Sequence, residues 1–80
     1  MSISIDEKNN AVKIILSNTL YPFDAVKKAA EDFRDIGDFT ISKKNVTSIV
    51  IKLKDKDYIS SIGYEFCNYV LALMKNEAFI

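Results

Sequence analysis

Four short stretches of this chain alternate apolar and polar side chains, and this alternation restricts the fold more than any other feature of the sequence. The stretches are residues 2–5, 12–17, 38–42 and 48–53. A period of two is typical of a β-strand with one dry face and one wet face. Polar segments, residues 6–10 and 43–45, separate the two members of each pair. The sequence therefore predicts two β-hairpins.

Each predicted hairpin precedes a segment with helical periodicity. In the first segment Pro22 suits the opening turn and Gly37 suits the C-cap, so we expect a helix between them. Asp24 and Lys28 have the spacing of a favourable ion pair. One face of this helix is apolar and consists of Ala25, Val26, Ala29, Ala30, Phe33 and Ile36.

The second helical segment, from about Ser61 to about Asn76, carries apolar side chains on two sides. The side predicted to cover the sheet consists of Ile62, Phe66, Tyr69, Val70 and Leu73. A second apolar stripe consists of Tyr64, Cys67, Leu71, Met74 and Ala78, and Phe79 and Ile80 follow it. Because one sheet cannot bury both sides, either the first helix covers the stripe or part of it binds another protein or a second copy of the chain.

The order of these elements, ββα repeated in one domain over residues 1–80, also predicts the topology. A strand–helix–strand connection is right-handed and makes its two strands parallel, which leaves a gap that the last strand can fill. We therefore expect an α+β fold, a ββαββα two-layer sandwich with a four-stranded sheet in the order 1-2-4-3 and both helices on one face, as in a permuted ferredoxin-like fold. The dry face of the sheet is predicted to consist of Ile3, Ile5, Val12, Ile14, Leu16, Phe39, Ile41, Ile49, Ile51 and Leu53.

The composition argues against several classes of function. Eleven lysine and arginine residues balance eleven aspartate and glutamate residues, so no net positive charge favours nucleic acid. The chain has no histidine, one cysteine and two glycines, which disfavours a zinc site or a glycine-rich phosphate loop. Cys67 is expected to pack in the core rather than act as a nucleophile, and Glu31 and Asp35 are expected to be solvated. We therefore expect no catalytic residue, no metal and no cofactor.

The sequence also carries no membrane or export signal. No apolar run approaches the ~18 residues of a membrane span, and the first residues lack the pattern of a signal peptide. We expect a soluble cytoplasmic protein without membrane or nucleic-acid partners.

The open face of the predicted sheet has no aromatic side chain on which bases could stack. Ile15 and Val50 are predicted to lie near each other on the two central strands. They are either ordinary surface aliphatics or a small docking patch.

Both helical segments resemble a known family. "YPFDAVKKAAEDFRD", residues 21–35, and "GYEFCNYVLALM", residues 63–74, are similar to the HxsD-like family of His-Xaa-Ser peptide systems. In that family a Tyr-x-x-(Asp/Glu)-Ala-(Ile/Val)-Lys-Lys-Ala-Ala helix precedes a Glu-Phe-x-Asn-x-(Val/Leu)-Leu helix, and Tyr69 departs from the acidic residue expected there. The resemblance implies a small accessory protein without catalytic residues, encoded with radical S-adenosylmethionine (radical-SAM) enzymes that modify a peptide.

Two functions remain open at this point. The first is a non-catalytic adaptor that binds a protein or peptide partner, such as a radical-SAM enzyme or its peptide substrate, through the second stripe or by strand addition to a sheet edge. Its candidate partner-binding residues are Tyr64, Cys67, Leu71, Met74, Ile15 and Val50. The alternative is a small-molecule-binding or catalytic domain with a homodimer cleft, in which Tyr21, Tyr64 and acidic residues supply polar groups.

Overall fold

The computed structural model describes residues 1–77 and contains the predicted order of elements. The first half consists of β1 (Ser2–Asp6), β2 (Ala11–Leu16), α1 (Phe23–Asp32) and the short 3₁₀ helix η1 (Arg34–Ile36). The second half consists of β3 (Gly37–Lys43), β4 (Thr47–Leu53), the 3₁₀ helix η2 (Lys56–Tyr58) and α2 (Ile62–Glu77).

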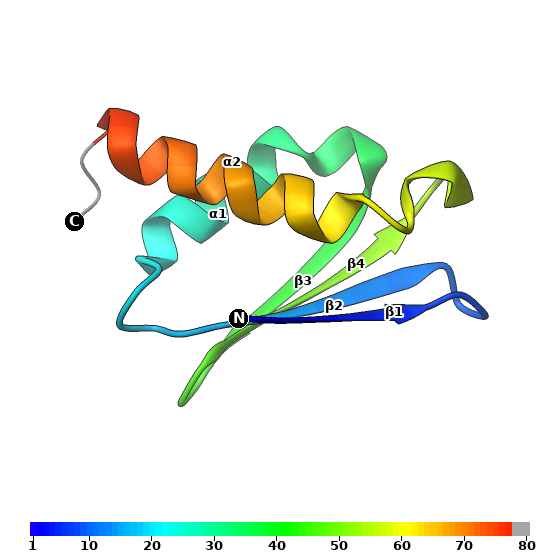
Figure 1. Cartoon of the computed structure of the whole chain (residues 1–80), viewed down its shortest axis with the longest axis horizontal. Coiled ribbons are helices and arrows are strands. Elements are labelled where there is room, and N and C mark those ends of the chain that lie inside the picture. The colour runs from blue at the N-terminus through cyan, green and yellow to red at the C-terminus, as the bar shows by residue number, and fades with distance from the viewer. Residues whose placement is uncertain (78–80) are drawn as a thin grey trace.

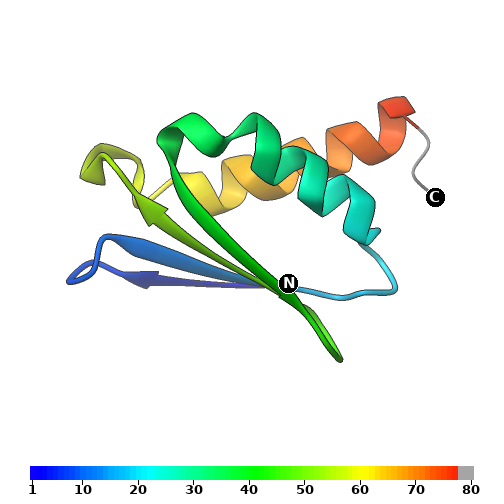
Figure 2. The same cartoon turned by 180° about the vertical axis from the view of Figure 1, so that it is seen from behind.

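The four strands form one sheet in the order β1-β2-β4-β3, and all neighbours are antiparallel. As a result, β2 and β3 run parallel to each other on either side of β4. Both helices cover the same face of the sheet, with α2 on the β1 side and α1 on the β3 side (Figures 1 and 2). The predicted fold, a two-layer ββαββα sandwich, is confirmed.

The core lies between the sheet and the two helices. Of the ten residues predicted for the dry face, six are buried and three more are partly buried against the core. The exception is Ile5, which is 46% exposed. Ile5 lies near the end of the edge strand β1, which pairs with β2 on one side, so fewer neighbours surround it.

Phe66 forms the centre of the contact between α2 and the rest of the core. Its buried ring lies 5.7 Å from the ring of Phe33 in a T-shaped arrangement and 5.5 Å from the ring of Phe39. Edge-to-face and tilted ring pairs of this kind stabilise a fold by about 0.5–1.5 kcal/mol each beyond area burial. The Tyr69 hydroxyl donates a hydrogen bond of 2.5 Å to Asp32 Oδ2 and so joins α2 to the end of α1.

The predicted end of the first helix is wrong. α1 ends at Asp32, and the chain continues through η1 before it enters the sheet. The C-cap of α1 is Phe33, whereas Gly37 follows η1 and is the first residue of β3, with an extended backbone (φ 171°). A glycine is needed there because a Cβ atom would lie 2.3 Å from the backbone oxygen of Lys52 on the paired strand β4.

Two details at the surface of α1 also differ from expectation. Pro22 is the N-cap, immediately before the first helical residue, rather than part of the opening turn. The ion pair present on this helix joins Lys28 Nζ to Asp32 Oδ1, at 3.0 Å. Lys28 thus pairs with the carboxylate that also accepts the hydrogen bond of Tyr69.

Candidate functional site

Two of the residues predicted to bind a partner, Tyr64 and Leu71, are exposed on the side of α2 that faces away from the sheet. We call this surface the outer face of α2. Tyr64 is 60% exposed and Leu71 is 45% exposed, so both lie where the second apolar stripe was predicted. The outer face consists of Tyr64, Glu65, Asn68, Leu71, Ala72 and Lys75, all of them exposed.

The other members of the predicted stripe do not share this exposure. Met74 is partly buried against the core, and Cys67 is 3% exposed and belongs to the core. Cys67 lies one helical turn from Gly63 and Val70, which are both buried, so it points to the same side of the helix. Its assignment as a partner-binding residue is therefore incorrect, whereas its packing in the core is confirmed. Ala78, Phe79 and Ile80 lie outside the described residues.

The burial of Cys67 also determines its chemistry. Loss of solvation raises the pKa of its thiol above the ordinary value. A thiolate is the reactive form of cysteine, so burial makes this side chain less nucleophilic.

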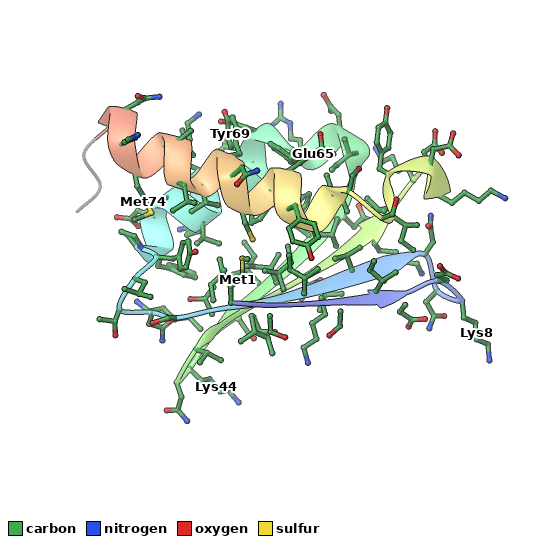
Figure 3. All side chains as sticks on the ribbon, in the orientation of Figure 1. Met1, Lys8, Lys44, Glu65, Tyr69 and Met74 are labelled. Atoms are coloured by element: carbon green, nitrogen blue, oxygen red, sulfur yellow. The ribbon has the colours of Figure 1, made fainter. Side chains whose placement is uncertain are left out.

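A hollow of about 600 Å³ lies along the second half of α2. Among residues 1–77, the side chains that line it are Asn68, Leu71, Ala72, Met74 and Lys75. Four of these belong to the outer face, and the fifth, Met74, contacts the core (Figure 3). The outer face thus contains a recess bordered by apolar groups, one amide and one ammonium group.

Ile15 and Val50, predicted for the open face of the sheet, are diagonal neighbours rather than a direct pair. Ile15 lies opposite Ser48, and Val50 lies opposite Lys13 and Thr40. Val50 is exposed and Ile15 is half-buried. Among the described residues the rest of this face consists of small or charged side chains, namely Ser2, Ser4, Asp6, Ala11, Lys13, Asp38, Thr40, Ser42, Ser48 and Lys52.

The open face therefore offers little for a docking partner beyond these two aliphatic side chains. A shallow hollow of about 280 Å³ lies beside Val50, between Asp6 and Lys13. Hydrogen bonds from Asn9 lower the pKa of Asp6, so its carboxylate is already engaged by the hairpin turn.

The edge of the sheet formed by β1 is a third candidate surface. Ile3 and Ile5 pair with Ile14 and Val12, so they lie on the helix side, while the serines between them lie on the open side. The Met1 side chain is exposed and points from the start of β1 toward α2 (Figure 3). Asp6 is the one charged residue within this strand.

Comparison with models of protein families, with characterised proteins and with solved structures returns no match. The likeness to the HxsD-like family thus rests on the two helical motifs alone. Within residues 1–77 no helix is both long and apolar enough to cross a membrane. In the same part of the chain, no group of three or more His, Cys, Asp or Glu side chains is placed to hold a metal ion.

The polar groups suggested for a homodimer cleft lie apart in the fold. Tyr21 is half-buried against the core, in the loop before α1, whereas Tyr64 is exposed in the first turn of α2. That loop lies at the opposite end of α2 from its first turn (Figure 1). Within one copy, these two tyrosines therefore do not belong to one site.

Sequence reasoning missed two features of these surfaces. Ile5 was assigned to the dry face but is exposed, and the signal available was its position near the end of a short first strand. The second feature is that Glu65 and Lys75, which carry opposite charges, lie at opposite ends of the outer face. The sequence contains that signal, because the two residues are ten positions apart on one helix.

Proposed function

We propose that this protein is a non-catalytic adaptor that binds an extended segment of a partner protein or peptide as an added strand on β1. The observation that carries the proposal is the outer edge of β1. Within residues 1–77, β2 is the strand that pairs with β1, on its inner side, and β1 ends the sheet. A strand at the end of a sheet presents unpaired N–H and C=O groups that can pair with another chain.

The sequence of β1 suits this role. Natural proteins protect such edges with lysine, proline, bulges or a covering segment. The five residues Ser2–Asp6 contain neither lysine nor proline, and each pairs in regular register with β2. Each added backbone hydrogen bond contributes about 0.5–1.5 kcal/mol net, and side-chain contacts along the edge must add to these bonds to offset the cost of association.

The side chains along this edge indicate which segment it would accept. Direct neighbours in a sheet lie on the same face. A bound strand would therefore place every second side chain beside Ile3 and the exposed Ile5, and the others beside Ser2 and Ser4. We expect a segment that alternates aliphatic with small polar residues.

The resemblance of residues 21–35 and 63–74 to the HxsD-like family supports a peptide as the partner. We extend the proposal accordingly to a peptide that a radical-SAM enzyme modifies, or to the enzyme itself, in the cytoplasm. A free, packed Cys67 fits a reducing compartment.

The test is selection from a displayed library of random ten-residue peptides, followed by amide hydrogen exchange of the complex. We expect enriched peptides to alternate aliphatic and polar residues and to slow exchange in β1. Ile5→Lys, on this edge, should weaken binding of a selected peptide at least about tenfold, because a charge would replace the apolar contact. Ser42→Lys, exposed on the opposite edge strand β3, is the matched control and should bind unchanged.

Two results would contradict the proposal. One is a selected peptide that slows exchange in β3 or α2 and leaves β1 unaffected. The other is equal affinity of the Ile5→Lys variant and the wild-type protein.

A further inference from the structure

The outer face of α2 carries a projecting aromatic side chain and a hollow that it cannot fill itself. Tyr64 projects from the first turn and is 60% exposed. The hollow of about 600 Å³ borders Leu71, Ala72 and Lys75 further along the helix. At a rise of about 1.5 Å per residue, Leu71 lies about 10 Å and Lys75 about 16 Å from Tyr64, so the Tyr64 side chain reaches at most the near end of the hollow at Asn68.

The same face carries a negative charge near its first turn and a positive charge near its last turn. Glu65 lies in the first turn of α2 and Lys75 in the last turn, and both are exposed. The Ser61 hydroxyl donates to Glu65 Oε2 at 2.9 Å, which holds this carboxylate in place and leaves Oε1 available. In the opposite half of the helix Lys75 borders the hollow.

These features complement each other when two copies of α2 lie antiparallel. The first half of one helix then lies over the second half of the other, so that each Tyr64 faces the partner copy's hollow. Glu65 of each copy lies next to Lys75 of the other, and both contacts occur twice. A parallel arrangement would instead bring Glu65 against Glu65 and Lys75 against Lys75.

From this complementarity we infer that the outer face of α2 binds a second copy of this chain about a two-fold axis near Asn68 and Leu71. A contact of this kind is isologous, with one self-complementary patch used by both copies. The positions Tyr64, Asn68, Leu71 and Lys75 follow one another at intervals of four, three and four residues. That spacing is the repeat by which paired helices keep one seam in contact.

The inference does not depend on the proposed function. It uses the side chains of α2, whereas the proposed peptide site uses the backbone of β1. Loss of dimerisation with peptide binding intact, or the reverse, would therefore separate the two.

The experiment reverses the charges of Glu65 and Lys75 and measures dimerisation by sedimentation equilibrium over a range of protein concentrations. The wild-type chain should form dimers. Glu65→Lys and Lys75→Glu should each weaken dimerisation at least about tenfold, because two attractions become two repulsions. An equimolar mixture of the two variants should form heterodimers of wild-type strength, since every contact then joins a lysine to a glutamate. The double variant should also dimerise.

Controls separate this contact from unfolding and from other apolar surfaces. Leu71→Glu should give monomers, whereas Leu20→Glu should dimerise normally, because Leu20 is 66% exposed but lies in the loop before α1. Circular dichroism checks that each variant is folded. A wild-type chain that stays monomeric at about 1 mM, or a mixture of the two charge variants that fails to associate, overturns the inference.

Discussion

Replacing Gly37 with alanine is expected to destabilise this fold severely, although the new side chain is a single methyl group. Its Cβ would lie 2.3 Å from the Lys52 oxygen and 3.0 Å from Leu53 Cα, and both atoms belong to the backbone of β4. Neither atom can move without separating β3 from β4 where Gly37 and Leu53 pair. The hydrogen bond from Lys54 N to Ile36 O, 3.0 Å long, lies beside this pair and would also be disturbed.

The expected loss combines these two effects. Forcing extra atoms into a packed site costs about 1–3 kcal/mol, and a weakened backbone hydrogen bond adds about 0.5–1.5 kcal/mol. A loss of about 2–4 kcal/mol is a large part of the ~4–12 kcal/mol expected for a chain of this length. It should lower the Tm by about 10–25 °C.

The assay is urea and thermal unfolding followed by far-ultraviolet circular dichroism. Asp38→Ala, at the next position of β3 with an exposed side chain, is the control and should change stability by less than about 0.5 kcal/mol. Gly37→Asn distinguishes the two interpretations of this glycine. Asparagine tolerates the left-handed conformation of a C-cap, but its Cβ would meet the same Lys52 oxygen. A Gly37→Asn variant close to wild-type stability would refute the steric argument.

Two further predictions follow from hydrogen bonding and burial at α2. Two hydrogen bonds, mainly the one from Tyr69 and then the one from Lys28, lower the pKa of Asp32 below its ordinary value of 3.8. The ionised Asp32 side chain therefore stabilises the fold fully above pH 3.8. This stabilisation is lost as the pH falls through the lower pKa that Asp32 has in the folded state. Tyr69→Phe should destabilise the protein at pH 7, and the difference in urea midpoint should shrink below pH 3.8. Asp32→Asn should show the same pH dependence, and a difference that stays constant with pH would contradict this reasoning. Cys67 should react with iodoacetamide at pH 8 far more slowly in the native protein than in urea, because burial shields the thiol and raises its pKa. Equal rates with and without urea would show that the thiol is accessible in the folded state.

The strands could be predicted to within about one residue at each end because their signal is local. Alternation of side chains and polar turns are properties of neighbouring residues. The end of α1 could not be predicted in this way. Phe33 and Ile36 continue the apolar spacing of the helix, but a 3₁₀ turn also places residues three apart on one side. The hydrogen bond from Ile36 N to Phe33 O, 3.0 Å long, keeps both side chains toward the core without an α-helix.

The candidate surface on α2 could be predicted in part, since periodicity identified a second apolar stripe but not its exposure. The depth at which a helix packs on a sheet depends on contacts between distant residues. At Gly63 a Cβ would lie 2.7 Å from Ile3 Cγ2 and 3.5 Å from Val12 Cγ1, so α2 lies close to β1 and β2 at this point. One turn later Cys67 is consequently buried, while Tyr64, next to Gly63 in the chain, points outward.

This close contact also explains why the two proposed binding surfaces are neighbours. The side chain of Ile3 lies against Gly63 at the start of α2, and its backbone belongs to the outer strand β1. The exposed Tyr64 follows Gly63 directly, so the outer face of α2 begins where the helix touches the edge strand. The two surfaces adjoin at this point but use different groups, since a strand added to β1 pairs with its backbone and a second copy contacts the side chains of α2. We therefore expect Leu71→Glu to lose dimerisation and to keep peptide binding at β1.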